Sequence, residues 1–413
     1  MVEGRSGWVR KALMTSCRWR GMFLMLACCG LPDAAGGASP SGPGVGAWAP
    51  MGRGVLGGST DDAVAAWNGT EMFVWGDLGT SGARYSSDLD RWIVAAADGS
   101  PGRGLGRFGP SIAWIDADRV LLWGGDGCGR DQASSCDDGL VYDTKRDAWS
   151  ALSSKNPPRG RIKHSTIWTG HQMIIWGGQT RLGGSVEVRA DGGSYDPVHD
   201  EWVSMSDRDA PSSRTSHTAV WTGRKMVIWG GYRWDEATNS SIFMNDGAVY
   251  DPAADAWVPT TLVGAPAGRS RHSAVWADGE MLVWGGDGCP ANRLPEPDSA
   301  PWGACGDGAA YDPELDRWRP ISRTGAPSPR VGHTAVWTGQ KMVIWGGLEG
   351  DGTRGNGASY VLSTDSWEPM TNDGAPSGRG LHWAFWTGTR MLIWGGGNGH
   401  MVGGFSDGGF FTP

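Results

Sequence analysis

Three features of the 413-residue sequence predict an all-β protein, a seven-bladed β-propeller with four-stranded antiparallel blades. A Trp-Gly-Gly string, Trp-Gly-Asp in the first copy, occurs seven times at intervals of 48 to 61 residues. In six copies a tyrosine precedes a second tryptophan by seven residues. The last copy ends at the C-terminus without that tryptophan, and a strand-like segment precedes the first copy. Periods of this length are typical of repeat architectures with one supersecondary element per repeat. The seven strings begin at Trp75, Trp123, Trp176, Trp229, Trp284, Trp345 and Trp394.

Residues 217–257 show the pattern of one unit in full. HTAVW and MVIWGG are short, β-branched and aromatic, and a Gly-containing turn joins them as a hairpin. GAVYDP then leads through an Asp- and Pro-containing turn to Trp257. These segments predict four strands in each unit.

The two ends of the chain supply complementary parts of one blade. Residues 47–51 (AWAPM) match the fourth-strand pattern at 367–370 (WEPM), whereas the last unit ends shortly after Phe411 and lacks a fourth strand. Pairing of these segments closes the ring and removes exposed sheet edges. We therefore expect one propeller over 46–413, with a closing strand at 46–51 and repeats at about 60–95, 107–152, 161–205, 214–260, 269–321, 330–370 and 379–413.

The abundant tryptophans and glycines have structural interpretations. Of the 26 tryptophans, 21 recur at fixed strand positions, so we expect them to pack between blades rather than form a sugar-binding platform. The 69 glycines have no collagen-like period, and the doublets suit close backbone approach at strand ends, not a phosphate loop.

Residues 1–29 have the features of an export signal. A basic region precedes the apolar run GMFLMLACC, and a Gly/Pro/Ser-rich spacer follows over residues 30–45. Leu26-Ala27-Cys28-Cys29 imperfectly matches a lipoprotein box, so the main alternatives are secretion and acylation of Cys28 or Cys29, and a third is an uncleaved cytoplasmic arm. The first two predict a location in the cell envelope or outside the cell, with a lipid anchor as the only membrane attachment.

Four further cysteines form two close pairs, each after the string Trp-Gly-Gly-Asp-Gly-Cys. Disulfides persist in oxidising compartments, and neither pair has the spacing or partner histidines of a zinc site. We predict disulfides Cys128–Cys136 and Cys289–Cys305, and no metal site.

The glycine doublet, the Tyr-Asp-Pro followed by Trp, and the preceding Arg and His resemble kelch repeats. The Trp-Thr-Gly and Ile-Trp-Gly-Gly motifs are similar to those of bacterial kelch proteins of the galactose oxidase central-domain superfamily. The resemblance covers residues 46–413 and implies the propeller fold. It does not settle function, because kelch propellers serve as enzymes, glycan binders and protein-interaction platforms.

An arginine lies three residues before a first-strand position that is histidine in five units. Ring closure would place six arginines near one mouth of the channel, and resemblance to kelch domains that bind acidic peptides there makes them candidate anion-binding residues. The alternative is a structural role, with each arginine bonding loop carbonyls of a neighbouring blade. We expect the histidines to be structural, since a ring separates them too widely for one metal. The arginines are Arg107, Arg161, Arg214, Arg269, Arg330 and Arg379, and the histidines are His164, His217, His272, His333 and His382.

Catalytic residues are not identifiable from the sequence. Galactose oxidase chemistry, as the resemblance implies it, needs copper and a tyrosine crosslinked to cysteine, whereas only Tyr232 is not part of the repeat. A sialic-acid mutarotase, also an exported kelch protein, is the enzymatic alternative, with Asp126 and Asp287 as possible acid or base groups. Trp302, in the longest insertion, is a second binding-site candidate because long insertions on rigid scaffolds often carry binding.

We therefore expect an exported interaction module for an extracellular protein, peptide or glycan, with an anionic ligand as one interpretation. It should be a monomer that uses no cofactor and binds no nucleic acid, since its net charge is −8.

Overall fold

A computed structural model describes residues 46–55, 63–76, 81–100, 107–128, 134–153, 155–183, 185–290, 302–350, 352–398 and 404–413. The chain divides into two compact units, Met1–Gly42 and Pro43–Pro413, and every described residue belongs to the second. The predicted signal of residues 1–29, the spacer of residues 30–45 and the acylation candidates Cys28 and Cys29 lie outside the described residues.

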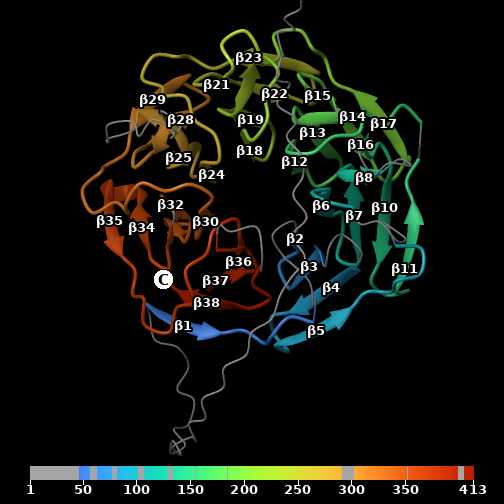
Figure 1. Cartoon of the computed structure of the whole chain (residues 1–413), viewed down its shortest axis with the longest axis horizontal. Coiled ribbons are helices and arrows are strands. Elements are labelled where there is room, and N and C mark those ends of the chain that lie inside the picture. The colour runs from blue at the N-terminus through green and yellow to red at the C-terminus, as the bar shows by residue number, and fades with distance from the viewer. Residues whose placement is uncertain are drawn as a thin grey trace, which may run out of the picture. The chain divides into compact units, whose positions relative to one another are not determined.

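In the second unit the described strands form seven four-stranded sheets and five two-stranded sheets. The four-stranded sheets follow one another around a ring, with the first strand of each blade nearest the centre (Figure 1). Neighbouring first strands contact each other around the ring, and the first strands of blades 7 and 1 are also in contact. The predicted seven-bladed all-β propeller is therefore confirmed.

The innermost strand of each blade consists mainly of small, β-branched and aromatic residues, which favour a pleated, half-buried surface. These first strands are β2 (Val64–Trp67), β6 (Ser111–Trp114), β12 (Ser165–Trp168), β18 (Thr218–Trp221), β24 (Ser273–Ala277), β30 (Thr334–Trp337) and β36 (Trp383–Trp386).

The second strand is the most deeply buried, because both of its faces are covered by neighbouring blades. Its side chains form near-continuous apolar runs, as expected for a strand without a solvent face. The second strands are β3 (Glu71–Gly76), β7 (Arg119–Trp123), β13 (Met173–Trp176), β19 (Met226–Trp229), β25 (Glu280–Trp284), β31 (Lys341–Trp345) and β37 (Met391–Trp394).

The third and fourth strands form the outer hairpin, in which the repeated tyrosine and tryptophan face each other across the strands; Tyr250 pairs with Trp257, for example. The third strands are β4 (Ser81–Ser86), β10 (Gly139–Asp143), β16 (Gly192–Asp196), β22 (Gly247–Asp251), β28 (Gly308–Asp312), β34 (Gly357–Val361) and β38 (Gly408–Thr412). The fourth strands are β5 (Arg91–Val94), β11 (Ala148–Ala151), β17 (Glu201–Ser204), β23 (Ala256–Pro259), β29 (Arg317–Pro320), β35 (Ser366–Pro369) and β1 (Ala47–Pro50). A short 3₁₀ helix, η1 (Leu362–Thr364), precedes β35.

Blade 7 combines both ends of the described chain, in the sheet order β1-β38-β37-β36. Trp48 in β1 lies opposite Phe411 in β38, and its indole N–H donates to the Thr371 carbonyl at 2.9 Å. The pairing confirms that an N-terminal strand completes the last blade.

The repeated tryptophans pack between blades, as predicted. Seven clusters of buried side chains each join two neighbouring blades. In the cluster between blades 4 and 5, Trp229 is fully buried and its ring centroid lies 5.3 Å from that of Trp318. The glycine doublet after Trp229 permits close contact between these blades: Gly230 has φ +72°, and a Cβ there would lie 2.9 Å from the Arg269 carbonyl of blade 5.

The spacing of the outer tyrosine and tryptophan follows from a contact with the preceding blade. In blade 4 the Tyr250 hydroxyl donates to Asp255 at 2.8 Å. The same carboxylate accepts the Ser206 N–H at 2.8 Å, and the Trp257 indole N–H donates to the Ser206 carbonyl at 2.9 Å. One linker residue of blade 3 is thus held by two side chains of blade 4.

Within the described ranges, five blades carry a two-stranded hairpin between their second and third strands. The end of the propeller with these hairpins is termed the hairpin face, and the opposite end, with the turns between strands 1–2 and 3–4, the turn face. The hairpins are β8 (Asp126–Cys128) with β9 (Ser134–Ser135), β14 (Gln179–Leu182) with β15 (Ser185–Val188), β20 (Tyr232–Asp235) with β21 (Ser240–Phe243), β26 (Asp287–Pro290) with β27 (Trp302–Ala304), and β32 (Leu348–Glu349) with β33 (Gly352–Thr353). Among the described residues, no helix has the length and apolar character needed to cross a lipid bilayer.

Candidate functional site

The six repeated arginines are buried in the linkers that lead into the first strands. Five are 0% exposed and Arg107 is 4% exposed. In blade 4 the Arg214 Nε donates to the Ser212 carbonyl at 2.9 Å. Its two Nη atoms reach the carbonyls of Gly230 (3.1 Å) and Asp246 (2.9 Å) and the Asp246 carboxylate (2.9 Å). The side chain therefore ties its linker to the corner between the second and third strands.

The other five arginines repeat this arrangement with few changes. Arg330 uses the Asn356 amide oxygen, at 3.0 Å, in place of a carboxylate. Burial and the nearby Arg354 charge lower the pKa of Arg330 to about 10, so it stays charged at neutral pH. The remaining ion pairs are Arg107–Asp138, Arg161–Asp191, Arg269–Asp307 and Arg379–Asp407.

This geometry corrects the expected position of the six arginines at the surface of the channel mouth. A guanidinium with no exposed area could reach a ligand only by giving up its carbonyl and carboxylate acceptors, which is costly for a buried charge. The hydrogen bonds agree with the structural alternative, in which the arginines bond loop carbonyls, with one correction: these carbonyls belong to the arginine's own blade and not to a neighbouring one.

The repeated histidines lie between blades. In blade 6 the His333 Nε2 lies 2.9 Å from the Ser273 hydroxyl of blade 5, and its ring meets Trp284 edge-on. Burial lowers the pKa of His333 to about 3, so the ring is neutral and suited to this enclosed position. His217 differs, because neither ring nitrogen has a hydrogen-bond partner among the described residues.

The rim of the channel is formed by the residue directly before each histidine position. Six such residues have φ between +50° and +60°, and they are termed the mouth residues: Gly109, Lys163, Ser216, Arg271, Gly332 and Leu381. Backbone hydrogen bonds link neighbouring blades here, including Leu381 N–H to the Gly332 carbonyl at 2.7 Å and Ser216 N–H to the Lys163 carbonyl at 3.3 Å. The rim is therefore held by backbone, while its side chains are free to vary.

A cavity of about 530 Å³ opens at this rim. Small and apolar residues of the first strands line it, including Val64 and Trp383, together with three of the repeated histidines and the mouth residues Arg271 and Leu381. The histidines are His272, His333 and His382. Leu381 is 55% exposed. The described residues of the lining include no carboxylate.

Basic side chains gather at one part of the mouth. The Arg271 Nε lies 3.1 Å from Asp287, and the Arg181 Nε lies 3.2 Å from Asp126. Lys163 has no carboxylate within ion-pair distance among the described residues. Partial burial and the charges of Arg181 and Arg271 lower the pKa of Lys163. This part of the mouth therefore has three basic side chains and two carboxylates, which leaves a net charge of +1.

Asp126 and Asp287, the acid–base candidates, begin the hairpins of blades 2 and 5. Each also accepts a hydroxyl, from Ser135 and Ser270 respectively, at 2.6 Å. They lie at the same position of two non-adjacent blades, so the structure does not bring them together.

Both predicted disulfides are present. Cys128–Cys136 and Cys289–Cys305 span Cα distances of 5.2 and 5.3 Å in the hairpins of blades 2 and 5. Among the described residues, clusters of three possible metal ligands occur only at these cysteine pairs, where the sulfurs are bonded to each other. Trp302 begins β27, and its side chain lies outside the described part of the structure.

The hairpins of blades 3 and 4 expose apolar side chains that the sequence analysis did not single out. Leu182, Val186 and Trp234 are 48%, 56% and 50% exposed. The sequence signal that could have identified them is the occurrence of apolar residues in otherwise polar insertions.

Comparison with known proteins supports the repeat assignment. The KLHDC2/KLHL20/DRC7 Kelch-repeats domain family matches residues 109–326. Kelch domain-containing protein 3 of Bos taurus is 30% identical over 251 residues, which covers 58% of this chain and 61% of that protein. Acyl-CoA-binding domain-containing protein 4 of Arabidopsis thaliana is 26% identical over 287 residues, covering 66% of this chain and 39% of that protein. The chain thus spans less than two thirds of the length of these relatives.

A solved structure titled "Structure of YjhT" has a TM-score of 0.55 and 16% identity, covering 78% of this chain and 99% of that chain. At this identity the likeness concerns the fold alone. The repeats, the ring and the match over residues 109–326 lead to one conclusion: the chain belongs to the KLHDC2/KLHL20/DRC7 Kelch-repeats domain family.

Proposed function

We propose that this propeller is a protein-interaction module that binds an acidic peptide segment across the channel mouth on its hairpin face. The observation that carries the proposal is the cavity of about 530 Å³ with Lys163, Arg181 and Arg271 at or near its rim. An apolar side chain of the partner would enter the cavity, while its carboxylates would face these basic groups. Export through residues 1–29, as the sequence predicts, would make the partner an extracellular one.

The exposed hairpins extend this surface. Leu182, Val186 and Trp234 give adjacent blades an apolar edge, and a large exposed aromatic residue is a common anchor in interfaces. Because five blades carry such hairpins, the face offers more contact area than the cavity alone. This supports a polypeptide partner over a small molecule.

The enzymatic alternative has less support. A sugar mutarotase needs an acid or base within hydrogen-bond reach of the substrate. The histidines that line the cavity are held neutral between blades, and its described lining contains no carboxylate. No observation favours that second function.

Selection of a displayed random-peptide library on the purified chain tests the proposal. It should enrich sequences with Asp or Glu near an apolar residue. Synthetic peptides from the selection should bind at least about tenfold more weakly to a Lys163→Glu, Arg271→Glu double variant, because each reversal sets like charges against each other.

An Arg224→Glu, Arg317→Glu double variant provides the matched control, since both arginines lie exposed at the turn face and the variant reverses the same number of charges. Enrichment without acidic residues, or an equal loss in the control, would overturn the proposal. Equal loss would indicate attraction to overall charge rather than to the mouth.

A further inference from the structure

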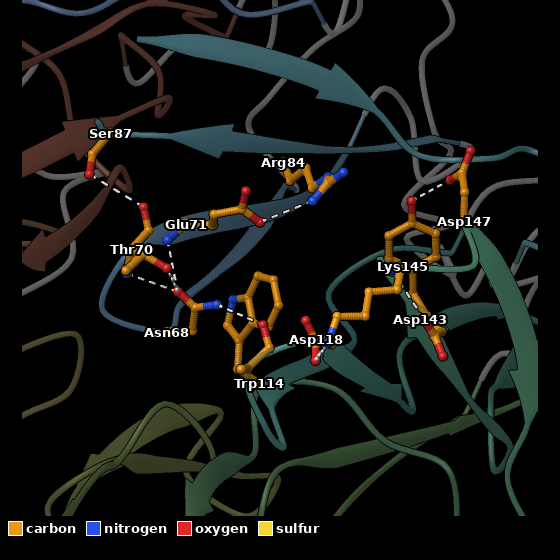
Figure 2. A network of polar contacts seen from close by, with 12 residues as sticks. Asn68, Thr70, Glu71, Arg84, Ser87, Trp114, Asp118, Asp143, Lys145 and Asp147 are labelled. Carbon is orange, nitrogen blue, oxygen red and sulfur yellow. Dashed lines mark hydrogen bonds and ion pairs between the residues drawn. The ribbon is translucent and has the colours of Figure 1, made fainter. Parts of the chain in front are cut away.

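A second cleft lies on the turn face between blades 1 and 2, with a volume of about 470 Å³. It is bounded by the strand 1–2 turns of both blades, the end of β4 and the strand 3–4 turn of blade 2. Figure 2 shows the polar side chains that converge there from these segments. The cleft is on the opposite face from the proposed peptide site, so it is independent of that proposal.

Two ion pairs form its walls. The Arg84 Nη1 lies 3.3 Å from Glu71, within blade 1. The Lys145 Nζ lies 2.6 Å from Asp118, within blade 2, and this contact raises the pKa of Lys145. The two basic and two acidic groups balance in formal charge.

Arg84 departs from the repeat. Its position in the third strand, directly before the repeated tyrosine, holds an uncharged residue in every other blade: Val141, Ser194, Val249, Ala310, Ser359 and Phe410. The side chain is 23% exposed, and its buried Nε has no hydrogen-bond partner among the described residues. The exposed part of the guanidinium, which contacts Glu71 through Nη1, is the part that can donate to a ligand in the cleft.

Asn68 fixes the geometry of the cleft. Its side-chain oxygen accepts the N–H groups of Thr70 at 2.9 Å and Glu71 at 2.7 Å. Its amide nitrogen donates to the Ala117 carbonyl of blade 2 at 3.3 Å (Figure 2). The turn is thereby held in shape and joined to the neighbouring blade, so the polar groups are positioned before a ligand arrives.

The balance of charge decides between ligand classes. A simple anion would meet the carboxylates of Glu71 and Asp118, and a cation would meet Arg84 and Lys145. An apolar ligand would leave these groups without solvent or partners. Alternating fixed donors and acceptors match a molecule that carries many hydroxyl groups, each of which can donate and accept.

We propose that this cleft binds an uncharged saccharide unit through hydrogen bonds to the Arg84–Glu71 and Lys145–Asp118 pairs. No aromatic side chain is among the described residues of its lining, so there is no stacking surface for the sugar ring. Binding should therefore be weak, with a dissociation constant on the order of 1 mM.

Ligand-observed saturation-transfer NMR on the full chain tests this, with the methyl glycosides of glucose, galactose and mannose as probes. At least one glycoside should bind saturably. Arg84→Val, which places the residue of blades 2 and 4 at this position, should weaken binding at least about tenfold. Lys145→Met should also weaken it, and that exposed position carries little risk for folding.

Arg319→Val is the matched control, because Arg319 of β29 forms an ion pair with Glu280 (Nε to carboxylate 2.9 Å), which begins the second strand of blade 5 as Glu71 begins that of blade 1. It should leave glycoside binding unchanged, and melting curves of all variants should be cooperative. Absence of binding by every glycoside, preferential binding of phosphate or glutamate, or undiminished binding by both cleft variants would overturn the proposal.

Discussion

Arg269 and Arg271 are separated by one residue in the linker that leads into β24, yet they differ in almost every physical respect. Arg269 has no exposed side-chain area, and its Nη1 donates to the Gly285 and Asp307 carbonyls, each at 3.1 Å. Its Nη2 lies 2.9 Å from the Asp307 carboxylate, an ion pair without hydrogen-bond alignment. The Arg271 side chain is 50% exposed and contacts Asp287 at the rim.

The difference between the two arginines shows that a residue type that repeats in this sequence has a structural role. The position of Arg269 is arginine in six of the seven blades, and in these blades it makes the same link between the linker and the strand corner. The position of Arg271 shares only a backbone conformation, since the rim is held by main-chain hydrogen bonds that any residue tolerating positive φ can make. A charged residue that recurs in the blades, such as Arg269, therefore indicates a structural role. A charged residue at a position where only the backbone conformation recurs, such as Arg271, indicates a place where the side chain can be used for binding.

The largest expected effect comes from removing the buried member of this pair. Arg269→Met leaves the Gly285 and Asp307 carbonyls and the Asp307 carboxylate without their partner, and should lower the free energy of unfolding by about 3–5 kcal/mol. Arg271→Met removes an exposed ion pair and should change it by less than about 1 kcal/mol. Urea unfolding of both variants measures the difference. Equal losses would show that the two arginines share one structural role.

The next effect concerns acid sensitivity. Burial lowers the pKa of His217 to about 3, from 6.5 for an exposed histidine. The unfolded chain therefore binds more protons between these values, and the free energy of unfolding should fall as the pH drops below about 6.5. One such residue contributes about 1.4 kcal/mol for each pH unit in this window.

His217→Phe isolates that contribution from the carboxylates, which also titrate in acid. Because neither ring nitrogen of His217 has a partner among the described residues, the variant should lose little stability at pH 7.5. Its unfolding free energy between pH 6 and 4 should decline by about 1.4 kcal/mol less per pH unit than that of the unmodified chain. An unchanged slope would mean that His217 is not held neutral in the fold. His171→Phe, at an exposed turn position, is the control for loss of a histidine.

Much of the fold was predictable because the determinants are local and repeated. The seven-residue spacing from Tyr250 to Trp257 predicts an antiparallel outer hairpin, and the structure adds why it does not vary: Asp255, between them, must reach both Tyr250 and the Ser206 N–H. The closing strand was predictable because residues 47–51 match a pattern that the last unit lacks.

The site was less predictable, because spacing gives a residue's place on a ring but not the direction of its side chain. The linker arginines were expected at the rim, whereas they turn into their own blades. Lys163 and Arg271 were missed since their position carries no repeated residue type, although it always precedes the histidine position. The turn-face cleft combines Glu71, Arg84, Asp118 and Lys145 from two blades, a juxtaposition that no single repeat contains.

The smallest expected effect distinguishes two equivalent outer tryptophans. Trp202 and Trp257 are 2% and 4% exposed, so Trp→Phe removes a similar buried area from each. Trp257 also donates to the Ser206 carbonyl at 2.9 Å, whereas the Trp202 indole N–H has no acceptor among the described residues. Trp257→Phe should therefore lower the free energy of unfolding by about 1 kcal/mol more than Trp202→Phe. Equal losses in thermal or urea unfolding would mean that packing alone sets this position, and the recurrence of tryptophan in the fourth strand would then reflect ring size rather than the bond to the preceding blade.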